Sequence, residues 1–266
     1  MLKALIKQAC AHIDYLDAVV IMAFVLNRSK TSILTARDCE TLTKDEIERF
    51  LSTVGQRAIH KPLAYILGKC EFMGLEFEVN EYTLIPRPDT EILVETALKV
   101  IKHTGKKKIL EICTGSGCIA VSLSVLCPAA LDITATDVSA EALEIAKKNA
   151  GRHGVSIRFI QADLFTGINP EEYDLIIANP PYIPHDEING LPDSVKNYEP
   201  HLALDGGADG LDFYRAIIKK PVNTLILEIG YNQAEDVKNI LEEHNFRDIQ
   251  VINDLAGHNR VIVGCR

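Results

Sequence analysis

The residues Asn179-Pro180-Pro181-Tyr182 have the chemistry to hold a planar –NH2 group. Proline has no backbone N–H and restricts the residue before it to extended conformations, so this segment is stiff. The amide oxygen of Asn179 and the carbonyl of Pro180 can each accept one N–H, and the Tyr182 ring can pack on the planar group. We therefore predict a site that orients an amino or amide nitrogen. The alternative is a proline-stiffened turn without a ligand.

An apolar run over residues 173–177 leads directly into this segment. Continuous apolar runs of this length are typical of buried parallel strands. Ligands of open α/β sheets bind beyond the carboxyl ends of such strands. Asn179 is therefore expected at the edge of a sheet where a ligand binds.

A second candidate site begins with the turn Cys113-Thr114-Gly115-Ser116-Gly117, which follows the predicted strand 108–112. Glycines at this place let the backbone approach a ligand closely. Asp137 ends the next predicted strand about 20 residues later, where an acidic group can bind both ribose hydroxyls of an adenosine. The G-x-G-x-x-G spacing of dinucleotide-binding enzymes is absent, which disfavours an oxidoreductase. Asp163 and Leu164 could flank an adenine, although Asp163 is almost as well suited to cap a helix.

These residues require a sheet whose strands alternate with helices. Helices are predicted from residue 117, over 139–150 and over 233–243, and the last helix is followed by a final pair of strands. Such alternation is typical of βαβ units and a mostly parallel sheet. The sequence predicts seven strands, at residues 108–112, 133–136, 157–160, 175–178, 225–229, 249–252 and 261–263.

The N-terminal part has a different pattern. Residues 1–68 contain no convincing strand, but they include the capping box Thr43 to Glu46 and a short helix, 63–67, that Gly68 is placed to end. We predict an all-helical domain there, in which His12 and His60 are ordinary isolated histidines. Residues 69–88 are predicted to be a β-hairpin linker, because residues 75–79 alternate before the turn-prone pair Asn80-Glu81. The third domain is then 89–266, beginning with a helix that Asp89 or Thr90 could cap.

Composition excludes several classes of protein. A hydrophobic content of 47% supplies real cores, and a net charge of −9 disfavours binding along a phosphate backbone and fits a basic protein partner better. No signal-peptide core is found, and the apolar segment 18–26 is too short to span a bilayer, so a cytoplasmic protein is expected. The seven cysteines are scattered, which predicts reduced and mostly buried thiols and neither disulfides nor zinc.

The segment 179–182 resembles the NPPY motif of methyltransferases that modify planar nitrogens with S-adenosylmethionine. Further segments extend the resemblance over nearly the whole chain: KPLAYILG (61–68), IPRPDTE (85–91), TGSG (114–117), NPPYI (179–183), DGLDFY (209–214) and DLAG (254–257). Together they are similar to the PrmC (HemK) family of peptide chain release factor glutamine methyltransferases.

This resemblance implies a seven-stranded Rossmann-like, S-adenosylmethionine-dependent methyltransferase domain with a small helical N-terminal domain that recognises the substrate. The implied reaction methylates the glutamine of the Gly-Gly-Gln motif of class 1 release factors and yields S-adenosyl-L-homocysteine, without a metal. A monomer is expected, without membrane or direct nucleic-acid binding. The implied glutamine-binding, catalytic residues are Asn179, Pro180, Pro181 and Tyr182. The predicted cofactor residues are Cys113, Thr114, Gly115, Ser116, Gly117, Asp137, Asp163, Leu164 and Asn179.

Two positions depart from the family pattern. Cys113 stands where the first glycine of the motif is usual, and its β-carbon restricts the turn; Leu164 stands where some members have tryptophan. Three other functions remain as alternatives: a ribosomal-protein glutamine methyltransferase, an adenine-specific nucleic-acid methyltransferase, and a non-catalytic cofactor-binding protein. The first alternative differs only in the protein substrate, and the second would need a base-reading domain that the chain does not evidently have.

Overall fold

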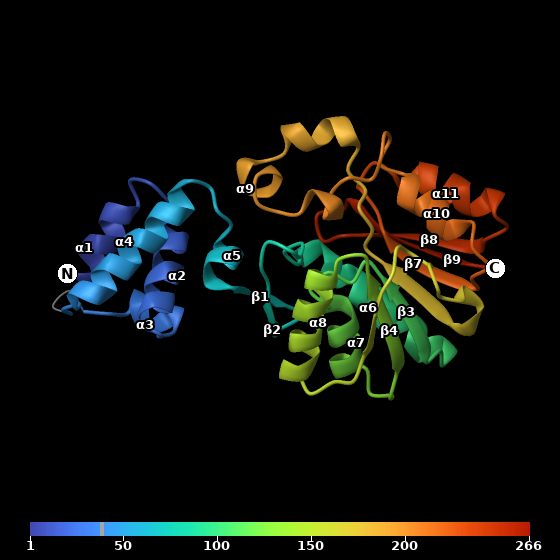
Figure 1. Ribbon diagram of the computed structural model, residues 1–266, viewed down its shortest axis with the longest axis horizontal. Coiled ribbons are helices and arrows are strands. Elements are labelled where there is room, and N and C mark those ends of the chain that lie inside the picture. The colour runs from blue at the N-terminus through green and yellow to red at the C-terminus, as the bar shows by residue number, and fades with distance from the viewer. Residues whose placement is uncertain (38–39) are drawn as a thin grey trace. The chain divides into compact units, whose positions relative to one another are not determined.

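A computed structural model describes residues 1–37 and 40–266 of the chain (Figure 1). The described residues form two compact units. The helical unit is Met1–Gly68 together with the short segment Asp193–Tyr198, and the α/β unit is Lys69–Pro192 together with Glu199–Arg266. A segment that follows the NPPY motif in the chain is thus part of the helical unit.

The helical unit packs its helices around one apolar core that includes Leu2, Met22 and Phe50. The Asp17 carboxylate accepts a hydrogen bond from Arg57 Nε at 2.6 Å, and the Tyr198 hydroxyl donates to the Ile59 carbonyl at 2.8 Å. The predicted capping box is present, and Gly68 ends the last of the five N-terminal helices with a φ of 70°. The helices are α1 (Leu2–Ala9), α2 (Tyr15–Val25), α3 (Lys30–Leu34), α4 (Lys44–Ala58), α5 (Leu63–Leu67) and α9 (Asp193–Lys196).

A two-stranded hairpin opens the α/β unit, formed by β1 (Lys69–Phe72) and β2 (Leu75–Glu78). Its turn consists of Met73 and Gly74, which both have positive φ, as a two-residue turn that matches the twist of its strands requires. The turn predicted at Asn80-Glu81 is present, with the Thr83 N–H donating to the Asn80 carbonyl at 3.0 Å, but it follows the hairpin and does not join its two strands. Met73 gives no turn signal in the sequence, and its N–H donates to the Glu91 carboxylate at 2.6 Å.

The main sheet has seven strands in the order β5-β4-β3-β6-β7-β9-β8, which confirms the predicted number. The first five strands of this order are parallel, and β9 runs antiparallel to both of its neighbours. The carboxyl ends of β3, β4 and β6 therefore share one edge. The strands are β3 (Lys108–Ile112), β4 (Asp132–Asp137), β5 (Arg158–Gln161), β6 (Leu175–Ala178), β7 (Thr224–Glu228), β8 (Arg247–Asn253) and β9 (Asn259–Cys265).

Helices cover both faces of this sheet and enclose two apolar cores. Leu93 of α6 (Glu91–Thr104) and Val121 of α7 (Cys118–Leu126) belong to the core on one face, where α8 (Ala140–Arg152) also packs. Tyr214 of α10 (Asp212–Ile218) and Leu241 of α11 (Ala234–Glu243) belong to the other. Figure 1 shows α10 and α11 together, apart from α7 and α8. Short 3-10 helices connect these elements: η1 (Pro88–Thr90), η2 (Pro170–Glu172), η3 (His185–Gly190) and η4 (His201–Ala203).

Two local predictions fail. Neither Asp89 nor Thr90 caps α6 with its side chain, because the 3-10 helix η1 precedes it and the Thr90 hydroxyl has another partner. The thiols are not mostly buried: of the six cysteines that the structure describes, all free, only Cys118 is buried and Cys10 is exposed at the end of α1. Cys39 lies outside the described residues.

Residues 1–37 and 40–266 contain neither a cluster of metal-ligating side chains nor a membrane-spanning helix. No cluster of three or more His, Cys, Asp or Glu side chains there could hold a metal ion. None of the helices in the same residues combines the length and the apolar character needed to cross a bilayer.

Candidate active site

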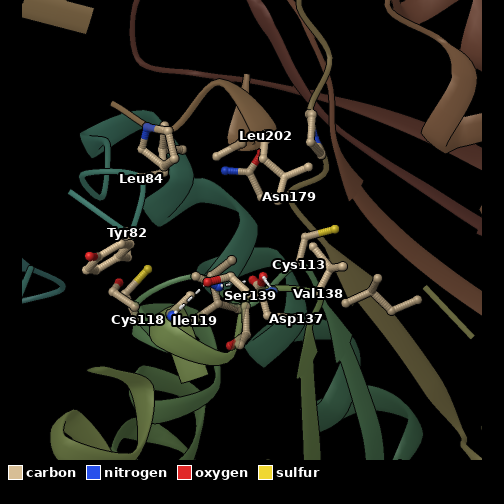
Figure 2. Close-up of a pocket in the computed structure, with 18 of the residues that line it drawn as sticks. Tyr82, Leu84, Cys113, Cys118, Ile119, Asp137, Val138, Ser139, Asn179 and Leu202 are labelled. Atoms are coloured by element: carbon tan, nitrogen blue, oxygen red, sulfur yellow. Dashed lines mark hydrogen bonds between the residues drawn. The ribbon is translucent and has the colours of Figure 1, made fainter. Parts of the chain in front are cut away.

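A cavity of about 400 Å³ lies at the carboxyl edge of the sheet, within the α/β unit. Figure 2 shows Asn179 and Leu202 on one side of it and Asp137 and Ser139 on the other. Nine of the predicted site residues line the cavity: Cys113, Thr114, Gly115, Ser116, Asp137, Asp163, Leu164, Asn179 and Pro181. The predicted residues Gly117, Pro180 and Tyr182 are not among the lining residues that the structure describes.

The turn after β3 is shaped by left-handed backbone conformations. Cys113, Gly115 and Gly117 have φ values of 60°, 54° and 78°. A Cβ atom on Gly117 would lie 3.0 Å from the Cβ of Ala146 in α8, so this glycine serves the packing of α7 on α8. Cys113 adopts the same region despite its side chain, which packs partly against an apolar core. The missing glycine therefore does not prevent the turn.

Asp137 connects the turn to the end of β4. Its Oδ2 accepts the Gly115 N–H at 2.8 Å, and its Oδ1 accepts the Ser139 N–H at 3.0 Å. Burial raises the pKa of this carboxyl, and the backbone hydrogen bonds oppose the rise. Each carboxylate oxygen can accept a further hydrogen bond. Asp137 can therefore hold the turn and still present acceptors to the hydroxyls of a ligand.

Glu111 is a buried acid in β3, just before the same turn. One of its oxygens accepts the Ala120 N–H at 3.0 Å, and the other has no hydrogen-bond partner among the described residues. Burial raises the pKa of Glu111 to about 8. Its position at the last-but-one residue of a buried strand, directly before a glycine turn, is the signal that could have indicated a buried structural acid.

Asp163 and Leu164 line the cavity as predicted, on the loop that follows β5. The alternative that Asp163 caps a helix is wrong, because the chain forms a turn there and no described helix begins at it. The Asp163 carbonyl accepts the Thr166 N–H within this turn, and Leu164 has a φ of 49°.

Asn179 follows β6 and faces the cavity from the other side. Its Nδ2 donates to the Thr90 hydroxyl at 3.3 Å. The Oδ1 atom makes no hydrogen bond to any residue that the structure describes, so it is free to accept one from a ligand. Thr90 lies in η1, far from Asn179 in the sequence, and the sequence offers no signal for this contact.

Tyr182 is held by residues behind the cavity. Its carbonyl accepts a hydrogen bond from Gln233 Nε2 at 2.9 Å, and its hydroxyl donates to Glu228 Oε1 at 3.5 Å. A Cβ on Gly210 would lie 2.4 Å from the Tyr182 carbonyl oxygen. A Cβ on Gly206 would lie 2.7 Å from the Cα of Tyr182. These contacts fix the backbone of the NPPY segment, and the described geometry does not bring the Tyr182 ring to the cavity.

Further lining residues come from two loops that the sequence did not connect. Tyr82, Leu84 and Arg87 precede α6, and Leu202 lies in η4 (Figure 2). The buried Glu199 joins the loops, because it pairs with the Arg87 guanidinium and accepts the Ile85 N–H at 3.2 Å. The loops form a partly apolar wall, and the motif pattern of the sequence gives no sign of it.

Comparisons with known proteins agree with this geometry. Residues 2–68 match the family described as the PrmC N-terminal domain, and residues 88–192 match the methyltransferase small domain. A release factor glutamine methyltransferase of Clostridium botulinum is 39% identical over 97% of this chain and 94% of its own. The one of Geobacter sulfurreducens is 41% identical over 84% of this chain and 80% of its own. The chain belongs to the release factor glutamine methyltransferase family.

Solved structures confirm the fold of this family member. The catalytic domain of hMettl16, in complex with an RNA hairpin, superposes with a TM-score of 0.59 over 87% of this chain and 85% of that one, at 18% identity. The predicted fold class is therefore confirmed: a seven-stranded Rossmann-like sheet of the S-adenosylmethionine-dependent methyltransferases, with an N-terminal helical region.

Proposed function

We propose that this chain transfers a methyl group from S-adenosylmethionine to the side-chain amide nitrogen of the glutamine in the Gly-Gly-Gln motif of class 1 release factors. The observation that carries the proposal is the Asn179 amide, whose nitrogen is held by Thr90 while its oxygen is free beside the cavity. The names of the relatives support the same substrate.

The residues around the cavity fit S-adenosylmethionine. Asp137 offers acceptors to ribose hydroxyls, and Leu164 offers an apolar wall beside Asp163, whose carboxylate can accept amino hydrogens. The volume of about 400 Å³ is in the range of small-molecule sites. When bound, S-adenosylmethionine would supply an electrophilic methyl group, and this chemistry requires no metal. The cofactor residues proposed are those of the turn 113–117 with Asp137, Asp163, Leu164 and Asn179.

The chain itself contributes orientation and charge stabilisation. An amide nitrogen is a weak nucleophile because its lone pair is delocalised, so a correct position accounts for much of the rate. Asn179 Oδ1 can accept one N–H of the substrate amide, and we assign the second N–H to the Pro180 carbonyl. Both acceptors would stabilise the positive charge that develops on the nitrogen, and its proton is then lost to water.

The helical unit is proposed to recognise the substrate protein. One glutamine among many provides little discrimination, and a second contact raises the effective concentration of the reacting loop. Helix α2 leaves Leu16 69% exposed and Phe24 41% exposed, although most of the same helix is buried. Such exposed apolar side chains are available for a partner.

A variant of the full chain tests this recognition role, because removal of residues 1–68 would also deprive residues 193–198 of their packing. We expect Leu16→Glu to lower methylation of an intact release factor and to leave that of a short Gly-Gly-Gln peptide unchanged. Equal losses on both substrates would mean that the change acts on the catalytic unit, and no loss on either would remove this surface from the recognition role.

The function itself is tested by mass spectrometry of a release factor after incubation with enzyme and S-adenosylmethionine. We expect one added methyl group on the Gly-Gly-Gln glutamine, and a much slower addition with Asn179→Ala. A purified ribosomal protein and an adenine-containing nucleic acid, incubated in parallel, represent the two alternative substrates. The proposal also includes a monomeric, cytoplasmic enzyme that binds neither nucleic acid nor membrane.

A further inference from the structure

Asn149 is completely buried near the end of α8, and its side chain forms three hydrogen bonds. Its Oδ1 accepts the Glu78 N–H at 2.7 Å. Its Nδ2 donates to the Glu78 carbonyl at 3.0 Å and to the Ser116 carbonyl at 2.8 Å. One side chain therefore holds both strand β2 of the hairpin and the turn after β3.

These three bonds require an amide. Two of them use N–H donors on one nitrogen and the third uses an acceptor, and asparagine is the shortest side chain that carries all of these groups. A carboxylate would present only acceptors to the two carbonyls, and an apolar side chain would bond to none of the three backbone groups. Asparagine is also unfavourable within a helix, so helix formation does not explain its presence in α8.

Asn149 restrains one peptide unit of the turn. The Ser116 carbonyl accepts from Asn149, and the N–H of the same peptide unit, on Gly117, donates to the Thr114 carbonyl at 2.9 Å. The unit needs this restraint because glycine adopts positive and negative φ about equally well, and Gly117 has a φ of 78°. Ser116 lines the cavity, whereas Asn149 is not among its described lining residues. Asn149 therefore acts on a ligand through the turn.

The hairpin has apolar anchors of its own, so it stays attached without Asn149. Phe72 and Phe77 are buried in the core that α7 shares, with their ring centroids 6.1 Å apart. What Asn149 adds is a fixed position of Glu78 relative to the turn. Glu78 pairs in the hairpin with Lys69, the residue that directly follows the first stretch of the helical unit. The position of this linker and that of the turn therefore depend on each other.

We propose that Asn149 is a positioning residue that joins the hairpin and the S-adenosylmethionine-binding turn into one cooperative element. The inference rests on the cofactor site of the proposed function. Coupling of this kind is reciprocal: if the docked hairpin raises the affinity for the cofactor, the bound cofactor stabilises the docked hairpin by the same factor. The linker between the two units therefore responds to whether the cofactor is bound.

Substitutions of Asn149 test its effect on the turn. Asn149→Leu keeps the branched shape and removes all three hydrogen bonds, and Asn149→Ala removes them without crowding the turn. We expect both to raise the Kd of S-adenosyl-L-homocysteine about tenfold in calorimetric titration, which corresponds to about one lost hydrogen bond. An unchanged Kd in both variants would overturn the proposal.

Ile145→Ala is the matched control, because Ile145 is buried in the same helix and does not line the cavity. The cavity left by the smaller side chain should lower the melting temperature, while the Kd of S-adenosyl-L-homocysteine changes less than about twofold. If Ile145→Ala raises the Kd as much as the Asn149 variants do, lost stability explains the effect and the positioning role is overturned.

The wild-type protein tests the coupling without any variant that has to fold. Saturating S-adenosyl-L-homocysteine should slow hydrogen exchange of the Glu78 N–H about fivefold or more, as followed by NMR. The reference is the Phe246 N–H, which donates to the Leu241 carbonyl at 3.0 Å and belongs to the other apolar core. No slowing at Glu78, or equal slowing at both amides, would overturn the proposal.

The same measurements distinguish this inference from the proposed function. A wild-type protein that binds no S-adenosyl-L-homocysteine contradicts the cofactor site, and the inference falls with it. If the protein binds this ligand and the Glu78 amide does not respond, the inference alone is wrong. If the amide responds and release factors remain unmethylated, the proposed substrate alone is wrong.

Discussion

The two sides of the cavity are built in different ways. On the side of the turn after β3, Asp137 accepts backbone N–H groups from Gly115, 22 residues away, and from Ser139, two residues away. On the side of the NPPY segment, the partners of Asn179 and Tyr182 are side chains 46 to 89 residues away in the sequence: Thr90, Glu228 and Gln233. One side is therefore local and made mainly of backbone, and the other is long-range and made of buried polar side chains.

This difference indicates what each side contributes. Backbone amides in a local turn form a surface that binds a ligand. A buried network of side chains requires every partner, because an unpaired polar group in the interior is costly. We therefore expect changes on the turn side to act on cofactor affinity, and changes on the NPPY side to act on turnover.

The largest effect is expected for Asn179→Ala. The substitution removes the acceptor proposed for the reacting amide, and the loss of one such donor or acceptor typically lowers kcat about 10²–10³-fold. Steady-state kinetics on a release factor would measure it, and the melting temperature should stay close to that of the wild type. Asn223→Ala, at the exposed amino end of β7, is the matched control and should retain full activity. Near-normal turnover of Asn179→Ala would mean that another group holds the amide.

Asp137→Ala should have the next largest effect. It is expected to change the affinity for S-adenosylmethionine, whereas Asn179→Ala changes kcat. Loss of charge-assisted hydrogen bonds to a ribose is expected to weaken S-adenosylmethionine binding by about 1.5–3 kcal/mol, or about 10- to 150-fold in Kd. Calorimetric titration measures this directly. Asp137→Asn keeps one acceptor oxygen and should lie between the wild type and Asp137→Ala. If the affinity is unchanged, the ribose role is excluded.

A third prediction concerns the close packing behind Tyr182. A Cβ on Gly210 would lie 2.4 Å from the Tyr182 carbonyl oxygen and 2.6 Å from Gln233 Nε2, so it would break the bond between them. We expect Gly210→Ala to lower kcat about tenfold, because the NPPY segment is displaced, and to leave the Kd of the cofactor nearly unchanged.

Gly154→Ala is the matched control for this substitution. Gly154 has a φ of 66°, similar to the 77° of Gly210, but no atom lies within 4 Å of its added Cβ. Its substitution therefore carries the backbone strain, about 1–2 kcal/mol in the free energy of unfolding, without the crowding. An equal fall of kcat in both variants would show that backbone strain, and not the contact with Tyr182, lowers kcat.

The same contrast explains what the sequence could predict. The strands 108–112 and 175–178 were found because buried parallel strands are continuous apolar runs, and Asp137 was found because it ends such a strand. The turn and Asn179 each lie directly after a strand, so their place at the sheet edge follows from local pattern. The hairpin turn at Met73 was not predicted, and the helix cap was wrongly assigned to Thr90, because the partners of these two residues, Glu91 and Asn179, lie 18 and 89 residues away.

Roles that depend on distant contacts left no pattern to find. Glu228 and Gln233 occupy the end of a strand and the start of a helix, where an acid and an amide are ordinary residues. Their function arises because β7 lies next to β6, which places them behind the NPPY segment. The apolar wall with Tyr82 and Leu202 arises in the same way from two loops that meet only in the folded chain.

The smallest effect is expected for substitutions of Cys113, which change the free energy of unfolding. Cys113 lies in the turn after β3, where a glycine is usual in the family. Its φ of 60° is unfavourable for any residue with a Cβ, by about 1–2 kcal/mol. Cys113→Gly removes this strain, but it also loses partly buried apolar surface and makes the unfolded chain more flexible, so the net change in the free energy of unfolding should be below about 1 kcal/mol.

Cys113→Ala isolates the backbone contribution, because it loses the thiol and keeps the Cβ. We expect Cys113→Gly to be more stable than Cys113→Ala by about 1 kcal/mol in urea unfolding with equal m values, since alanine retains the strain that glycine relieves. The Kd of S-adenosylmethionine should change less than about threefold in both variants, because the backbone N–H of Gly115 and its bond to Asp137 persist. If the two variants are equally stable, the turn tolerates a Cβ without strain. A loss of affinity in Cys113→Gly alone would show instead that the side chain at position 113 restrains the turn in its binding conformation.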